Sequence, residues 1–162
     1  MWALLIPRNT TSGSSIKQIV VASVYYSSSQ TRRADFLDHI SQSYHILCSK
    51  YGSNLKFIIS GVLNRLKLEP ILNLSPYFHQ AVKVTTRRNP DAILDVIITN
   101  LHALFHPPTT LEPLDNDDDN SGKPSDHLPV VMYPLTNQNP VQAKRYKIIR
   151  YRPYPDSAIR EF

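Results

Sequence analysis

Two apolar segments on either side of one amphipathic segment constrain the fold of this chain more than any other feature. Residues 16–26 read IKQIVVASVYY, and residues 55–59 read LKFII; both are apolar runs with the length of buried strands. Between them, in residues 32–50, apolar side chains recur every three or four positions, which is the spacing of one helix face. Because strand, crossover helix and strand form a βαβ unit, we expect two neighbouring parallel strands.

Shorter segments extend this pattern to a mixed α/β order. Gly52 stands where a glycine commonly ends a helix. A polar loop is expected at residues 85–90, and Asp95 lies inside an otherwise apolar strand, where a carboxylate needs a partner. The remaining expectations are a short helix at residues 66–74 that Pro70 interrupts, strands at residues 80–84, 93–99 and 128–135, and an exposed loop at residues 102–120.

Composition narrows the class of protein. The chain has 162 residues, which favours one domain with its own core. Hydrophobic residues make up 41% and charged residues 19%, which argues against a disordered chain. No apolar run reaches the roughly 20 residues of a membrane helix. The single cysteine, Cys48, excludes an internal disulfide framework, and the first residues lack the basic segment of a signal peptide, so we expect a nuclear or cytoplasmic protein that is not secreted.

The positive charge is concentrated near the C-terminal end. The net charge is +5, and residues 143–162 contain six basic and two acidic residues. Residues 137–162 contain few aliphatic side chains, so we expect an extended or weakly packed segment. A solvated linker is one interpretation of this segment, and contact with nucleic-acid phosphates is the other.

Four polar residues are candidates for chemistry because each lies within or beside a predicted strand. They are Asn64, Asp95, Asp126 and His127. Ligands of open α/β sheets bind at strand ends. A histidine beside carboxylates suits phosphodiester chemistry, since carboxylate oxygens can hold Mg²⁺ and the imidazole can meet a phosphate oxygen. The plainer alternative is that Asp126 caps a turn and His127 is an ordinary surface residue.

Four motifs, taken in order, resemble the endonuclease/exonuclease/phosphatase superfamily, which includes DNase I-like nucleases and inositol phosphatases. More narrowly, the chain resembles the endonuclease of non-LTR (LINE-type) retrotransposon polyproteins. The third motif is similar to the family's Thr-Arg loop and Leu-Asp-x-Ile-x-Thr-Asn strand, and the fourth to its Ser-Asp-His motif. The motifs are VVASVYYSSSQ at 20–30, FIISGVLNR at 57–65, TTRRNPDAILDVIITN at 85–100 and KPSDHLPV at 123–130.

The resemblance implies an α/β fold that is part of a DNase I-like two-sheet sandwich. Residues 1–136 would correspond to the C-terminal part of the domain, without the family's N-terminal third, and an apolar face would stay uncovered. Residues 137–162 resemble the linker that precedes a reverse transcriptase. The implied activity is Mg²⁺-dependent nicking of DNA to prime reverse transcription. The implied partners are DNA, retrotransposon RNA or the reverse transcriptase region of a parent polyprotein, with no membrane.

The same resemblance implies a role for each matching residue. Tyr25 matches the tyrosine that bonds the scissile phosphate, and Asn64 matches the asparagine that positions phosphate or water. Thr86 matches the active-site threonine, with Thr85 as the alternative register. Asp95 matches the carboxylate that orients the catalytic histidine. The remaining matches are Asp126 as the Mg²⁺-associated carboxylate, His127 as the catalytic histidine, and the basic residues Arg87, Arg88, Lys144, Arg145 and Lys147 as DNA contacts.

Two departures from the family pattern predict an impaired or inactive enzyme. Val62 stands where the family's Gly-Asp-Phe-Asn motif has its aspartate. Valine has no proton acceptor, and loss of a general base typically lowers a rate ~10²–10⁴-fold. The family's N-terminal Glu, which holds Mg²⁺, has no counterpart before Tyr25. The alternatives are a non-catalytic nucleic-acid-binding fragment that uses Arg87, Arg88 and the basic segment, and a phosphatase for small phosphoesters.

Overall fold

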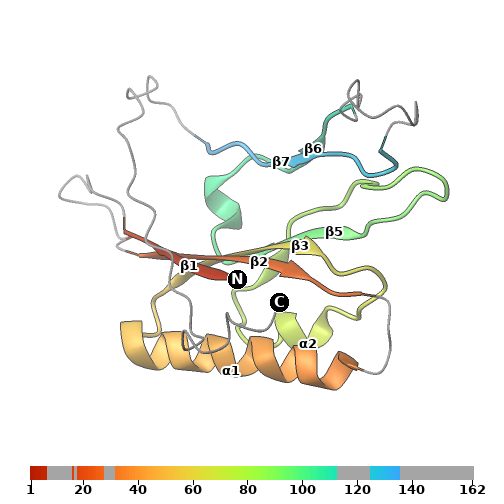
Figure 1. The fold of residues 1–162 in the computed structure, drawn as a ribbon. Coiled ribbons are helices and arrows are strands. Elements are labelled where there is room, and N and C mark those ends of the chain that lie inside the picture. Colours follow the sequence, from red (N-terminus) through yellow and green to blue (C-terminus); the bar gives the residue numbers. More distant parts are fainter. Residues whose placement is uncertain (7–15, 17, 28–31, 113–124, 136–162) are drawn as a thin grey trace, which may run out of the picture.

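The computed structural model describes residues 1–6, 16, 18–27, 32–112 and 125–135. These residues form a mixed α/β structure, as expected, with a five-stranded sheet in the order β1-β2-β3-β5-β4 and a two-stranded sheet β6-β7 (Figure 1). The elements are β1 (Trp2–Leu5), β2 (Ile19–Tyr25), α1 (Arg33–Tyr51), β3 (Lys56–Val62), α2 (Glu69–Leu72), β4 (His79–Gln80), β5 (Asp95–Thr99), the 3₁₀ turn η2 (His102–Leu104), β6 (Thr109–Thr110) and β7 (Val130–Val131).

The expected βαβ unit is present. Strands β2 and β3 pair in parallel from Ile19 opposite Lys56 to Tyr25 opposite Val62, and α1 connects them. The helix ends at Gly52, whose φ of 94° suits glycine and whose N–H donates to the Cys48 carbonyl at 2.8 Å. The core of the fold therefore follows the order that the apolar pattern predicts.

Strand β3 continues past the expected Ile59 as far as Val62 because it is the central strand. Its last residues pair with β2 on one side and with antiparallel β5 on the other. Gly61 permits this close pairing: its φ is 147°, and a Cβ there would lie 1.8 Å from the Val24 carbonyl oxygen. A side chain at this position would therefore collide with the backbone of β2.

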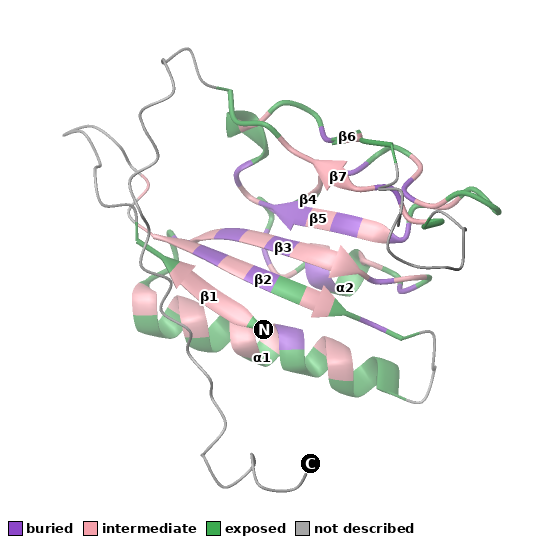
Figure 2. Ribbon diagram, turned by 45° about the horizontal axis from the view of Figure 1, so that its top comes forward, coloured by how far each residue is buried: buried purple, intermediate pink, exposed green. Residues whose placement is uncertain are grey.

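Buried and half-buried residues alternate along the central strands (Figure 2), so the two faces of the large sheet differ in burial. On the face that packs against α1, the side chains of Val20, Phe57, Ile59 and Ile98 are buried together with Ile40 of the helix. The opposite face is less covered among the described residues. Its side chains Ile19, Val21, Ile58, Val62 and Ile97 are half-buried, and the β6–β7 sheet lies over only part of it (Figure 1).

Several segment expectations need correction. Strand β1 was not expected; it pairs antiparallel with β2 at the edge of the sheet. Residues 102–112 are not a plain loop, since they contain η2 and β6. Pro70 lies in the first turn of α2, where its missing N–H has no helical partner to lose, so it does not interrupt the helix.

The three strands expected after β3 are all shorter in the structure, and β5 begins at Asp95 and not at Ile93. The pairing at residues 80–84 is reduced to His79–Gln80, and the last strand to Val130–Val131, between Pro129 and Pro134. Proline supplies no N–H to a strand ladder, so these two residues limit the length of the last strand. The expectations for residues 113–124 and 137–162 lie outside the described residues. Within the described ranges, no helix has the length and apolar character that crossing a membrane requires.

Candidate active site

Strand register places Tyr25, Val62 and Asp95 in one row across the sheet. Tyr25 is paired with Val62 between β2 and β3, and Val62 is paired with Asp95 between β3 and β5. Directly paired residues of neighbouring strands project from the same face. The three side chains therefore leave the face opposite α1, and Tyr25 is 71% exposed there. Tyr25 is a surface residue and not part of the core.

His127 lies in the segment that leads into β7, and its side chain contacts the side chain of Asp95 in this row. The His127 Nδ1 and Asp95 Oδ2 atoms are 3.0 Å apart, and both side chains are partly buried. Both residues line a pocket of about 480 Å³, together with Ser60 of β3. A carboxylate at Nδ1 favours the proton on that nitrogen and presents Nε2 for proton transfer. The expected contact between the two residues is present.

The loop at residues 85–90 holds this segment in place through the backbone. The Leu128 N–H donates to the Thr86 carbonyl, and the Arg88 N–H donates to the Asp126 carbonyl, each at 2.8 Å. The Ser125 hydroxyl accepts from the His127 N–H at 3.2 Å, so it supports the turn as expected. His127 is therefore positioned by backbone pairing on both of its sides.

Thr86 lies behind the site and not in contact with solvent. Its side chain is fully buried, and its hydroxyl oxygen accepts from the N–H groups of Leu94 and Asp95 at 3.0 and 3.1 Å. These bonds hold the start of β5, where Asp95 projects. Thr86, which the resemblance implies to be an active-site threonine, thus positions the backbone of Asp95. Thr85, the alternative register, is half-buried.

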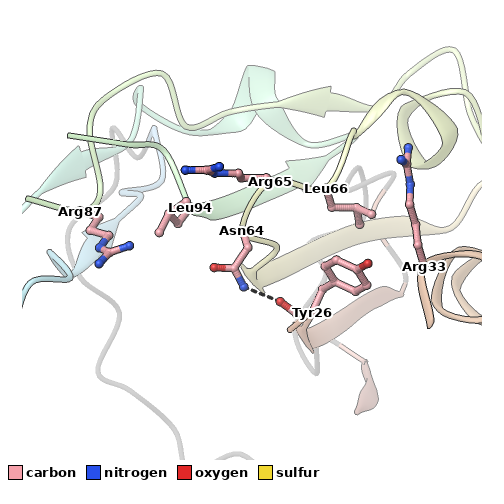
Figure 3. A pocket seen from close by; sticks show the side chains of 7 residues that line it. All are labelled: Tyr26, Arg33, Asn64, Arg65, Leu66, Arg87 and Leu94. Atoms are coloured by element: carbon pink, nitrogen blue, oxygen red, sulfur yellow. Dashed lines mark hydrogen bonds between the residues drawn. The ribbon is translucent and has the colours of Figure 1, made fainter. Parts of the chain in front are cut away.

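Asn64 does not line the pocket of Asp95 and His127, so these three candidates do not converge in one pocket. It follows the end of β3 with a φ of 49°, and its side-chain amide donates to the Tyr26 carbonyl at the end of β2. The amide thereby joins the ends of two parallel strands. Asn64 lines a separate pocket of about 760 Å³, which shares no described lining residue with the first (Figure 3).

Asp126 and the two loop arginines form exposed ion pairs. Arg87 Nε donates to Asp126 Oδ2 at 2.7 Å, and Arg88 donates to Glu112 at 2.9 Å. The Arg87 guanidinium holds the pKa of the Asp126 carboxyl below its usual value, chiefly through this hydrogen bond. Both arginines proposed to contact DNA are therefore paired with carboxylates. The other three, Lys144, Arg145 and Lys147, lie outside the described residues.

The described donors do not fit a Mg²⁺ site. One oxygen of Asp126 is engaged by Arg87 and one oxygen of Asp95 by His127. Val62, between Tyr25 and Asp95, offers no oxygen ligand. In residues 1–6, 16, 18–27, 32–112 and 125–135, no three side chains of His, Cys, Asp or Glu are grouped so that they could hold a metal ion.

Two arginines that line the larger pocket were missed by sequence reasoning. Arg33 begins α1, and Arg65 follows Asn64 in the turn after β3. Both had a signal in the sequence. A basic residue in the first turn opposes the helix dipole, and a basic residue just after a strand end is well placed for an anion.

Comparison of the chain with protein-family models, with curated proteins and with solved structures finds no match in any of the three. The resemblance to retrotransposon endonucleases therefore rests on the four sequence motifs. The chemistry of the site rests on the contacts described above.

Proposed function

We propose that this chain carries the histidine–aspartate half of a phosphodiesterase site and descends from a retrotransposon DNA endonuclease. The observation that carries this proposal is the 3.0 Å contact between His127 and Asp95. The two residues belong to different motifs, 32 positions apart in sequence, yet they form the pair that the resemblance implies. The small β6–β7 sheet over the face opposite α1 supports a partial DNase I-like sandwich.

The chemistry of this half-site is proton transfer near a phosphate. Asp95 would stabilise the imidazolium that forms when His127 Nε2 takes a proton, as in other carboxylate–histidine pairs. The exposed Tyr25 hydroxyl lies on the same sheet face and would donate to a phosphate oxygen. Val62, in the middle of the row, supplies neither a base nor a ligand oxygen. We therefore propose little or no cleavage of unactivated DNA.

Assays with two substrates distinguish a half-site from a complete enzyme. Supercoiled plasmid with Mg²⁺ or Mn²⁺ requires full catalysis, whereas bis(p-nitrophenyl) phosphate has an activated leaving group that needs little protonation. We expect no plasmid nicking above background. We expect slow hydrolysis of the activated diester that falls to background in His127→Ala. His39→Ala, a change on the exposed face of α1, is the matched control and should hydrolyse the diester at the parent rate.

Each outcome is decisive for one part of the proposal. Plasmid nicking that depends on His127 would show an intact enzyme and overturn the proposed impairment. Equal rates for the parent and His127→Ala on the activated diester would overturn the catalytic role of the half-site. The alternative of a nucleic-acid-binding fragment would then be the function to test, and the pocket around Asn64 favours it because three arginines line it.

A further inference from the structure

Three arginines from separate parts of the chain line the pocket around Asn64. Arg33 comes from the start of α1, Arg65 from the turn after β3, and Arg87 from the loop before β5. In Figure 3, Arg87 and Arg33 stand at opposite ends of the view and Arg65 between them. The other described lining residues are Tyr26, Asn64, Leu66 and Leu94, so no carboxylate of the described residues lines the pocket.

The described residues neutralise the positive charge of this pocket only in part. Arg87 shares its charge with Asp126 at 2.7 Å. In the part of the chain that the structure describes, no ion pair joins Arg33 or Arg65 to a carboxylate, and both residues are exposed. Arg33 also lies at the positive end of the α1 dipole, although Asp35 is in the same turn. An arginine at this position destabilises the helix, and a bound anion would offset this cost.

The pocket is larger than one phosphate group. Its volume is about 760 Å³, and its apolar surface is supplied by Leu66, Leu94 and Tyr26. Separated guanidinium groups over a partly apolar surface suit a chain of phosphates that carries sugars and bases between them. A single small anion would need the guanidinium groups to converge on one point.

We propose that this pocket binds the phosphate backbone of a nucleic-acid strand, with Arg33 and Arg65 contacting separate phosphates. The proposal deepens the proposed function and rests on it for the identity of the polyanion. Through Arg87, which bonds Asp126 next to His127, the strand would run from this pocket toward the histidine–aspartate pair. The Asn64 amide lies in the same pocket and holds the turn that presents Arg65.

The test compares two double variants of the full chain that remove the same charge. Arg33→Gln with Arg65→Gln alters the pocket, whereas Lys50→Gln with Lys83→Gln alters exposed positions that do not line it. Binding of a fluorescein-labelled single-stranded DNA oligonucleotide is followed by fluorescence anisotropy over a series of salt concentrations. Circular dichroism shows that each variant is folded.

We expect the pocket variant to weaken oligonucleotide binding at least ~10-fold at low salt, because charge-assisted contacts to phosphate are lost. The slope of log K against log salt should fall by about 1.4, which corresponds to two phosphates of a single strand at about 0.7 each. The Lys50/Lys83 variant should keep the affinity and slope of the parent. Equal weakening in both variants, or parental binding by the pocket variant, would overturn the proposal.

Two further measurements are needed. They distinguish a nucleic-acid strand from a small phosphorylated ligand, and the proposed binding from the proposed catalysis. A nucleoside triphosphate should not displace the oligonucleotide at comparable concentrations. If it displaces the oligonucleotide and its binding depends on Arg33 and Arg65, the pocket binds a small phosphorylated ligand and the strand is wrong. The second measurement is hydrolysis of the activated diester by the parent and by His127→Ala. Failure of the hydrolysis test with retained, Arg33- and Arg65-dependent binding would thus overturn the proposed catalysis alone.

Discussion

Val62 and Asp95 are direct partners in the antiparallel ladder between β3 and β5. Their side chains leave the same face of the sheet, with Cβ atoms expected roughly 4.5–5.5 Å apart for such a pair. The family resemblance implies an aspartate in place of Val62, which would put two carboxylates opposite each other. Valine removes that repulsion and also removes the oxygen atoms that catalysis needs. At this position, stability of the sheet and chemistry of the site oppose each other.

Val62→Asp should therefore destabilise the fold in a pH-dependent way. Two neighbouring carboxylates raise the pKa of one of them, so the destabilisation is present at neutral pH and is relieved as pH falls and that group takes a proton. The urea midpoint of the variant should be closer to that of the parent at about pH 4–5 than at about pH 7. Val62→Asn introduces a polar group without charge, and its deficit should not change over this range.

The Asp95–His127 contact should appear as a coupling energy. A double-mutant cycle with Asp95→Ala and His127→Ala, followed by urea unfolding at neutral pH, should give about 0.5–1.5 kcal/mol of coupling. Both side chains are partly buried, which places the pair above typical surface ion pairs. Additive effects of the two changes would show that the pair is absent in solution.

Thr86 should matter for stability through its hydroxyl group. Thr86→Val keeps the shape but leaves the Leu94 and Asp95 N–H groups without their acceptor, so the free energy of unfolding should fall by about 2–4 kcal/mol. Thr86→Ser keeps the acceptor and should lose less. A larger loss for the serine variant than for the valine variant, measured by urea unfolding, would contradict this explanation.

Gly52 and Gly61, the two described glycines with positive φ, should respond differently to alanine. Gly61→Ala meets both backbone strain and the Val24 carbonyl oxygen, so we expect a loss of more than about 3 kcal/mol in the free energy of unfolding, or failure to fold. At Gly52 nothing lies within 4 Å of an added Cβ, so strain of about 1–3 kcal/mol is the whole cost. Expression yield and thermal unfolding provide the comparison, and an equal response would argue against the close approach of β2 and β3.

The pKa of the Asp126 carboxyl should depend on Arg87. The folded-state pKa is lowered, so the pair stabilises the fold above the unfolded-state pKa of about 3.9 and this contribution is lost as pH falls through the folded value. Arg87→Gln should raise the Asp126 pKa toward its usual value, measured by NMR of the carboxyl carbon. Arg88→Gln removes the partner of Glu112 and should leave the Asp126 titration unchanged.

Residues 85–100 show which structural features a local sequence pattern predicts and which depend on tertiary contacts. The apolar run at residues 93–99 was sufficient to predict the strand that the structure shows as β5, and the one carboxylate in that run was sufficient to predict a partner for Asp95. The burial of Thr86 could not be predicted, because a threonine in a polar loop looks the same whether its hydroxyl meets solvent or two backbone N–H groups. Only the folded loop, which is paired with residues 126–128, decides between these arrangements.

By itself, the sequence predicted the βαβ unit of β2, α1 and β3, the glycine that ends the helix and the need of Asp95 for a partner. These follow from periodic burial and from the cost of an unpaired carboxylate in an apolar strand. That the partner is His127 was implied only by the family resemblance. Tertiary structure alone decided that β1 joins the edge of the sheet, that Asn64 turns away from His127, and that Arg33 and Arg65 line one pocket. These outcomes depend on contacts between distant segments. Strand register and the packing of α1 set the geometry of these contacts, and a local sequence pattern predicts neither the register nor the packing.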